Sequence, residues 1–159
     1  MAKAVYQGRY TAKTDEPYVV FIIGMRINRF LAFRKWIPVF RAMTPMIREL
    51  YEHSELGFLH TEISWNFRRV VFTQYWRSYD NLLYYAHGQR HLQAWQQFNQ
   101  LSRNNHAVGV FHETYVIEKG SSEAIYDNMP RQGLAKAFEH EKVTKETKSS
   151  KLRMRRGIK

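Results

Sequence analysis

Apolar residues along the chain follow two different periods, and the changes from one period to the other predict the elements of the fold. Residues 18–27 are apolar almost without interruption, which is typical of a central strand with both faces covered. Residues 59–65 alternate apolar and polar side chains, and residues 69–76 are rich in β-branched and aromatic side chains. The short polar turn between them predicts a hairpin. Residues 107–118 predict a last strand.

Two helices are predicted between these strands. Residues 30–57 place apolar side chains three and four positions apart, although two prolines fall inside this stretch. A second helix is predicted over about residues 80–101, with a break near Gly88. Residues 5–17 form a polar lead-in that we expect to lie along the surface.

The resulting order of strand, helix, strand, strand, helix and strand is the ferredoxin-like pattern. We therefore predict an α+β fold in which a βαββαβ sheet carries its helices on one face. The other face of such a sheet is bare, and apolar or aromatic side chains on it favour burial against a second sheet. We expect a homodimer whose two sheets close into an α+β barrel.

The net charge of the 159 residues is +11, but it is unevenly distributed. Nine Lys or Arg and three Glu lie between residues 136 and 159, so this segment carries +6 of the total. It has few apolar residues with which to offset the entropy of ordering. We predict a single ferredoxin-like domain over residues 1–135 and a basic, flexible tail over residues 136–159. A contact of the tail with nucleic acid is the weaker alternative, because a solvated terminus explains the same charge.

The absence of cysteine excludes disulfides, thiol nucleophiles and Cys-ligated metal sites. The first eight residues lack the apolar core of a signal peptide, and the apolar run over residues 18–25 is too short to cross a bilayer. We therefore expect a cytoplasmic protein with no membrane partner.

A histidine with aromatic neighbours makes the second predicted helix the first place to look for a site. His91, Trp95 and Phe98 recur at i, i+4 and i+7, so they share one helix face. A neutral histidine beside apolar groups can serve as a general base or as an axial haem ligand. A structural histidine, bonded to a backbone carbonyl or to Glu113, is the open alternative. His112, on the last predicted strand, is the natural partner or substitute for His91.

Arg26 and Asn28 stand at the end of the first predicted strand, where an unpaired charge would be costly. Arg26 is a candidate anchor for a substrate carboxylate or a haem propionate. An ion pair of Arg26 with Glu62 or Glu113 is the open alternative. The candidate catalytic residues are therefore His91, His112 and Glu113, the candidate cofactor-binding residues are His91 and Arg26, and the candidate pocket residues are Asn28, Trp76, Trp95, Phe98 and Tyr115.

The sequence predicts no metal site. His60 and Glu62 share a strand face, and His112 precedes Glu113, but two candidate ligands do not define a coordination sphere. No Walker-type loop, dinucleotide fingerprint or nucleophile elbow is present. The cofactor therefore stays open, with haem as a candidate and no flavin or NAD motif.

Several short stretches carry a resemblance to a known family. They are residues 8–11, 21–28, 36–39, 74–78, 91–95, 112–115 and 126–130. In them the chain resembles a monooxygenase-like family of bacteria and fungi that includes the polyene-cleaving monooxygenase of the fumagillin pathway. More distantly, it is similar to the dimeric α+β-barrel superfamily of antibiotic-biosynthesis monooxygenases, haem-degrading enzymes and haem aldoxime dehydratases. The resemblance implies the barrel dimer and matches His91 to the position where haem-using members place their ligand, but it leaves the reaction open.

Three functions are compatible with these residues. The first is a monooxygenase-like oxidoreductase that acts on a small hydrophobic substrate in an aromatic-lined pocket, with oxygen activated by the substrate or by a haem. The second is a haem-binding or small-ligand-binding module, of which haem-dependent dehydratase-like chemistry is a variant. The third is nucleic-acid binding through the basic tail, which would weaken steeply as salt rises.

Overall fold

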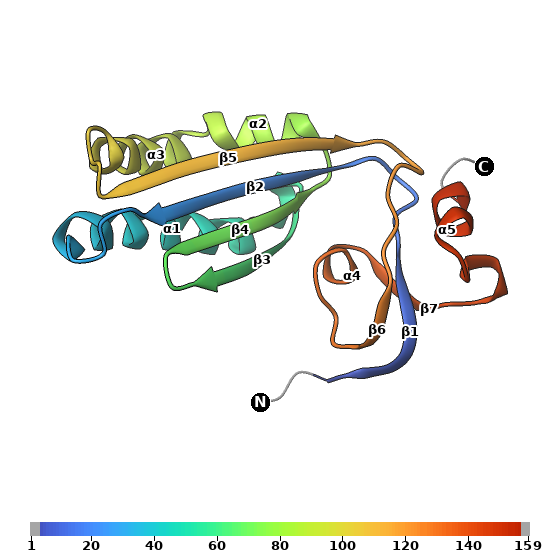
Figure 1. Cartoon of the computed structure of the whole chain (residues 1–159). Coiled ribbons are helices and arrows are strands. Elements are labelled where there is room, and N and C mark those ends of the chain that lie inside the picture. The colour runs from blue at the N-terminus through green and yellow to red at the C-terminus, as the bar shows by residue number, and fades with distance from the viewer. Residues whose placement is uncertain (1–3, 157–159) are drawn as a thin grey trace.

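The computed structural model describes residues 4–156, apart from the side chains of residues 89–92, 94, 155 and 156. Its larger part is a four-stranded antiparallel sheet in the order β3-β4-β2-β5 (Figure 1). The strands are β2 (Tyr18–Ile27), β3 (Phe58–Asn66), β4 (Arg69–Trp76) and β5 (Val108–Ile117). β2 is central, because β4 pairs with it on one side and β5 on the other.

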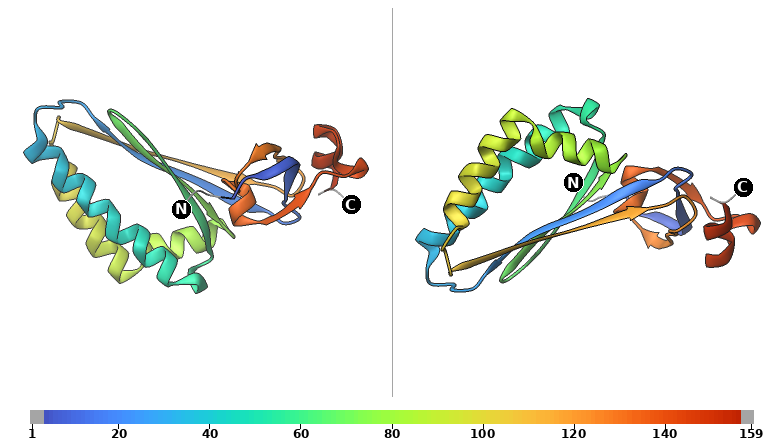
Figure 2. Two further views of the ribbon diagram at one scale, coloured as in Figure 1. Left: turned by 90° about the horizontal axis from the view of Figure 1, so that it is seen from below. Right: turned by 90° about the horizontal axis from the view of Figure 1, so that it is seen from above.

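Three helices lie on one face of this sheet, as Figure 2 shows from two sides. They are α1 (Phe33–Glu52), α2 (Tyr79–His87) and α3 (Gln89–Ser102). Ser78 begins α2 as its N-cap, since its hydroxyl oxygen accepts a hydrogen bond from the backbone N–H of Asn81 at 3.1 Å. The chain breaks at Gly88 between α2 and α3, as predicted. The predicted ferredoxin-like βαββαβ order, with helices on one face, is confirmed.

The first helix differs from the prediction at both ends. α1 begins at Phe33 and continues through Pro38 and Pro45 to Glu52. A separate 3₁₀ turn, η1 (Ser54–Leu56), follows it and ends at Gly57, whose φ of 78° lies in the left-handed region that glycine adopts without strain.

Apolar side chains fill the space between the helices and the sheet in two clusters. One lies around Met25, Val39 and Phe72, and the other lies around Leu50 and Trp76. Both draw on the odd-numbered residues of β2, because successive strand residues point to opposite faces.

The even-numbered residues of β2 point to the face that carries no helix, which we call the bare face. Val20 and Ile22 are half-buried there and Arg26 is exposed. One chain alone covers this face only in part, and its full cover by a second subunit stays a prediction. An uninterrupted apolar run does not distinguish cover by the same chain from cover by another.

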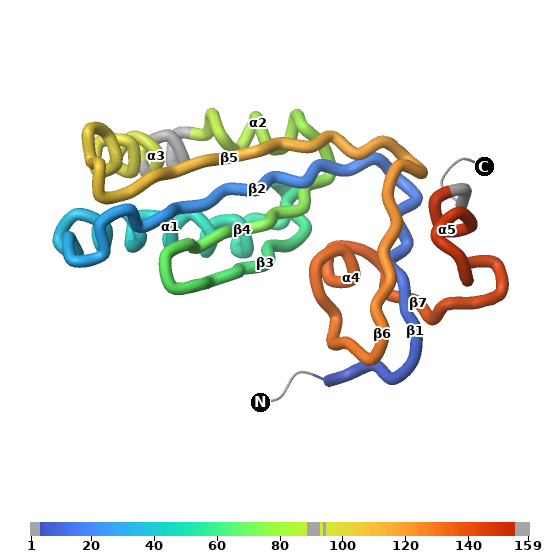
Figure 3. Tube along the Cα trace, in the orientation of Figure 1, coloured from blue at the N-terminus to red at the C-terminus, as the bar shows by residue number. Residues whose placement is uncertain are grey.

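A second, three-stranded sheet stands beside the first, in the order β6-β1-β7 (Figures 1 and 3). Its strands are β1 (Tyr6–Lys13), β6 (Tyr126–Met129) and β7 (Glu139–Lys142). The sequence predicts no strand in the polar lead-in over residues 5–17, whereas β1 lies there and is the central strand of this small sheet. Short helices follow its outer strands: α4 (Leu134–Ala137), the 3₁₀ turn η2 (Lys145–Thr147) and α5 (Ser150–Arg156).

The segment expected as a flexible tail makes defined contacts in the structure. β7 pairs with β1 from Lys13–Glu139 to Tyr10–Lys142. Farther on, the side chain of Arg153 donates to Glu123 at 2.6 Å. Its flexibility in solution stays a prediction that truncation can test.

No described helix is both long and apolar enough to span a membrane.

Candidate functional site

A groove of about 500 Å³ lies between α3 and the first half of β5. Trp95 on α3 and Val108 and Val110 on β5 form its apolar wall. Trp95 and Val110 are each about half exposed, so a ligand in the groove would contact them directly. The polar residues that line it come from the second half of α3 and its C-terminal end: Gln96, Asn99, Gln100, Ser102 and Arg103.

His112 follows the apolar wall along β5. Because residues two apart in a strand share a face, His112 points to the same side of the sheet as Val108 and Val110. Its ring lies 5.8 Å from the ring of Phe21, measured between centroids. The imidazole is exposed, and neither of its nitrogens has a hydrogen-bond partner among the residues that the structure describes. It is therefore available to a ligand.

The aromatic residues predicted to form the pocket are divided between the groove and the core. Trp95 lines the groove, whereas Phe98 is buried in the core cluster between α1, α3 and the sheet. Trp76 is fully buried, and its indole N–H donates to Gln74 Oε1 at 3.0 Å. The side chain of His91, on α3, lies outside the described residues.

The remaining predicted site residues lie on the bare face, away from His112. Glu113 and Tyr115 are exposed there, and the Tyr115 hydroxyl donates to Glu113 Oε2 at 2.7 Å. Glu113 accordingly raises the pKa of Tyr115. Arg26 donates through Nη1 to Asn28 Oδ1 at 2.7 Å, and within the described part of the chain it forms no ion pair with Glu62 or Glu113. The sheet thus separates Arg26 and Glu113 from the groove within one chain.

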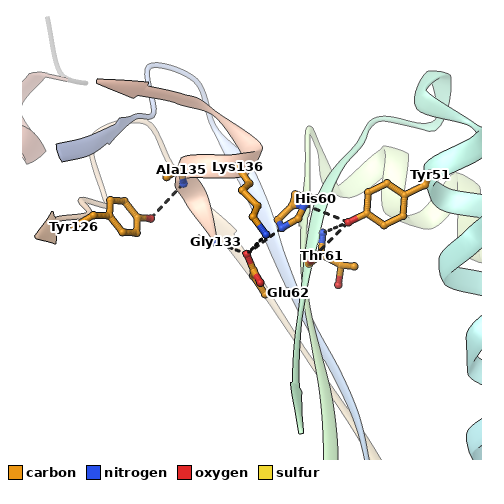
Figure 4. A network of polar contacts seen from close by, with 8 residues as sticks. All are labelled: Tyr51, His60, Thr61, Glu62, Tyr126, Gly133, Ala135 and Lys136. Atoms are coloured by element: carbon orange, nitrogen blue, oxygen red, sulfur yellow. Dashed lines mark hydrogen bonds and ion pairs between the residues drawn. The ribbon is translucent and has the colours of Figure 1, made fainter. Parts of the chain in front are cut away.

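A polar network that the sequence did not reveal ties α4 to the edge of the large sheet (Figure 4). Glu62 Oε1 on β3 accepts from the backbone N–H of Gly133 at 2.9 Å, from Lys136 Nζ at 3.0 Å and from His60 Nε2 at 3.1 Å. Burial alone would raise the pKa of Glu62, but these three donors together hold it below its ordinary value. The spacing of His60 and Glu62 predicts that their side chains lie close together. The sequence gives no indication that Gly133 and Lys136 donate to the same carboxylate.

The same network reaches α1 through His60. The Tyr51 hydroxyl lies 3.2 Å from His60 Nδ1 and accepts from the backbone N–H of Thr61 at 3.3 Å. In a neutral ring that donates from Nε2 to Glu62, Nδ1 is the acceptor for Tyr51. Tyr51 thereby satisfies the backbone N–H of Thr61 on the outer edge of β3.

Tyrosines gather at the same junction. Burial, and then the neighbouring Tyr126, Tyr18 and Glu62, raise the pKa of Tyr75 to about 12. The Tyr126 hydroxyl accepts from the backbone N–H of Ala135 at 3.2 Å. Tyr75 therefore stays protonated at neutral pH, which is consistent with a structural role at the contact between α4 and the large sheet.

Other sites in the described part of the chain offer less. Its His, Asp and Glu residues form no group of three or more that could hold a metal ion. A small hollow beside the small sheet, lined by polar residues such as Thr11, Ser122 and Arg153, has room for about one water molecule.

Comparison with known proteins adds a family and a fold. A family model described as Monooxygenase af470-like matches residues 18–134, from β2 through the start of α4. No curated protein sequence matches the chain.

Among solved structures, an aldoxime dehydratase in complex with butyraldoxime is similar over 96% of this chain, with a TM-score of 0.66 and 12% identity. The chain spans 43% of the dehydratase chain. A conserved protein of unknown function from Bacteroides thetaiotaomicron matches 64% of this chain and 99% of its own, with a TM-score of 0.49 and 8% identity. The oxygenase SnoaB from Streptomyces nogalater matches 62% of this chain and 90% of its own, with a TM-score of 0.41 and 14% identity. The first of these likenesses supports the fold, and the two lower scores add nothing to it.

Proposed function

The chain belongs to the Monooxygenase af470-like family, and on this premise we propose that it oxidises a small hydrophobic substrate in the groove between α3 and β5. The observation that carries the proposal is the position of His112, whose imidazole follows the apolar wall of the groove on the same face of β5. An apolar groove with a few polar groups at its rim is the usual form of a small-molecule site.

In this proposal the groove residues bind the substrate, and His112, two residues beyond Val110 on β5, carries out the chemistry. Trp95, Val108 and Val110 hold the apolar body of the substrate, and Arg103 with the neighbouring amides orients its polar groups. His112, as a neutral imidazole, removes a proton from the substrate carbon that will be oxidised. The resulting electron-rich substrate reacts with dioxygen, so that a CH₂ group and O₂ give a carbonyl group and water. The substrate then supplies all the electrons, which suits a chain with no flavin or nicotinamide motif.

Haem binding is the second candidate function. The observation that favours it is the same imidazole, because a histidine whose nitrogens have no partner in the described chain can serve as an axial ligand. Arg26, considered as an anchor for a haem propionate, lies on the opposite face of the sheet and would require a haem bound there or a second subunit.

One experiment tests both candidates. The protein is purified from a haem-replete host, its absorption spectrum is recorded, and oxygen consumption is followed with a panel of hydrophobic substrates. We expect substrate-dependent oxygen uptake that His112→Ala lowers by about 10²–10⁴-fold, as for a lost acid–base group. His106→Ala, an exposed histidine just before β5, is the matched control and should keep full activity. Full activity in His112→Ala would overturn the assignment of this residue, and a haem band that is lost in His112→Ala would favour the second candidate.

The homodimer and the cytoplasmic location also belong to this proposal. The half-buried apolar residues of the bare face, Val20 and Ile22, support burial against a second copy.

A further inference from the structure

The loop between β2 and α1 and the β3–β4 hairpin lie at the end of the molecule away from the C-terminus (Figures 1 and 2). Large apolar side chains are exposed in these segments. They belong to the loop before α1, the first residue of α1, the end of β3 and the turn that follows it. We call them the apolar tip: Phe30, Leu31, Phe33, Trp65 and Phe67. Their exposed fractions are 40%, 87%, 53%, 69% and 70%. Solitary exposed apolar residues are ordinary, but a cluster of this kind marks a contact surface.

Contacts between the two segments hold the tip together. The rings of Phe30 and Phe67 stack with their centroids 4.7 Å apart. The indole N–H of Trp36 donates to the carbonyl oxygen of Phe30 at 2.9 Å, which anchors the loop to α1. On the hairpin, Trp65 packs against Phe40 of α1 at 5.5 Å between centroids. These contacts therefore hold the side chains of the apolar tip in defined positions.

The sequence segments that form the apolar tip contain basic residues but no acidic ones. Residues 17–48 and 63–79 contain no Asp or Glu. Six exposed cations lie in or next to the tip segments: Arg29, Arg34, Lys35 and Arg68, with the cross-strand pair Arg26 and Arg69 at the adjoining end of the bare face. The ion pairs between described residues involve other cations: Lys13, Lys136, Arg153, His53 and His60. The positive charge around the tip is therefore not neutralised by the described part of the chain.

We propose that the apolar tip inserts into the interface of an anionic lipid membrane, with the surrounding arginines and lysine on the lipid headgroups. Exposed aromatic and aliphatic side chains gain by burial at the headgroup boundary, and cations next to them gain from anionic lipids. The two contributions add only for a partner that is both apolar and negatively charged. The absence of a spanning segment led us to expect no membrane partner, but attachment to a membrane surface needs no span.

Other occupants fit these residues less well. A second copy of the chain meeting the tip across a twofold axis would bring six more cations against the first six. A single-stranded nucleic acid would match the charge, but Leu31, the most exposed side chain of the tip, offers no flat ring for base stacking.

Sedimentation with vesicles tests the proposal, and it needs no substrate and no activity. The full chain is mixed with vesicles of phosphatidylcholine alone and of phosphatidylcholine with phosphatidylglycerol, at low and at high salt. We expect binding to the anionic vesicles that weakens as salt rises. The double variant Leu31→Glu/Phe67→Glu should bind at least about tenfold more weakly, because it removes apolar area and adds repulsion.

The control is Tyr84→Glu, which changes an aromatic residue that is 72% exposed on α2. It should bind as the unchanged protein does, and circular dichroism should confirm that both variants fold. Failure to bind anionic vesicles, or equal binding by the tip variant and the control, would overturn the proposal. A single-stranded oligonucleotide is added as a competitor. If it displaces the protein from the vesicles, and its own binding is lost in Leu31→Glu/Phe67→Glu, the proposal is overturned in favour of nucleic acid.

Discussion

The ring of Phe111 on β5 occupies the space that a side chain at Gly24 on β2 would need. The two residues are cross-strand partners, and a Cβ at position 24 would stand 2.5 Å from Phe111 Cε1 and 3.0 Å from the carbonyl oxygen of Val70. The guanidinium of Arg69 lies over the same ring, 5.6 Å from its centroid. Gly24 therefore lets one aromatic ring lie flat on the bare face.

The first prediction follows from this contact. Gly24→Ala should lower the free energy of unfolding by about 1–3 kcal/mol, because the new methyl group displaces the ring and approaches the backbone. Urea denaturation of Gly24→Ala, Phe111→Ala and the double variant measures the coupling between the two sites. We expect the double variant to lose less free energy of unfolding than the sum of the losses in the two single variants. Strict additivity would show that ring and glycine do not compete for the same space.

The second prediction concerns the acid stability that Glu62 confers. Hydrogen bonds from Gly133, Lys136 and His60 hold the pKa of Glu62 below the 4.5 of a free glutamate, despite its burial. A lowered pKa in the folded state contributes stability above pH 4.5, and this contribution disappears as the pH falls through the folded pKa. The melting temperature of Glu62→Gln should therefore be lower than that of the unchanged protein at neutral pH and converge with it in acid.

The matched control is Glu118→Gln, which alters an exposed carboxylate at the end of β5. Its melting curve should parallel that of the unchanged protein at every pH. A constant difference between Glu62→Gln and the unchanged protein down to acid pH would contradict the role given to the carboxylate.

The third prediction concerns assembly through the bare face. At micromolar concentration the protein should sediment as a dimer that buries about 1,200 Å² or more. Ile22→Arg places a charge in the centre of that face, beside Thr73 and Glu113, and should shift the protein toward monomer. Tyr84→Arg, on α2, should leave the dimer intact. If the unchanged protein is a stable monomer at this concentration, the prediction of a dimeric barrel is wrong.

The fourth prediction concerns truncation after Lys142. A flexible tail would leave the melting temperature unchanged, but Thr147 is only 3% exposed and Arg153 donates to Glu123 at 2.6 Å. We therefore expect deletion of residues 143–159 to lower the melting temperature. Differential scanning calorimetry of the two chains measures the effect. Identical transitions would support the flexible tail expected from composition.

The fifth prediction concerns His91. If it is an acid–base residue or a haem ligand, His91→Ala should lower turnover by about 10²–10⁴-fold or abolish a haem band. The same measurements on His112→Ala show which histidine the chemistry needs. Unchanged spectrum and activity in His91→Ala would make that residue structural and leave His112 as the candidate.

The sequence predicted the elements of the large sheet well because each carries its own period. The strand limits expected at 18–27 and 69–76 agree with β2 and β4. The small sheet was missed because β6 and β7 have only four residues each and β1 is polar, and because β1 pairs only with segments distant in sequence. Local propensity contains no signal for such pairs.

The candidate site was predictable only in part, for a similar reason. The spacing of Trp95 and Phe98 indicates one helix face, but it does not tell which of the two is covered by α1 and which lines the groove. For the same reason Trp76 was expected to line a pocket, whereas α2 and β3 bury it completely. Strand alternation was more informative, since it separates His112 from Glu113 without any knowledge of packing.

The place of β1 in the small sheet has a consequence for biosynthesis. β1 leaves the ribosome before the large sheet, yet both strands that pair with it, β6 and β7, are translated after the large sheet is complete. Until then the nascent chain carries a strand with two open edges, and closing the loop to its partners costs entropy that local contacts do not repay. A chain that stops short of β6 would fold its large sheet and still expose β1, which makes premature termination a route to aggregation for this protein.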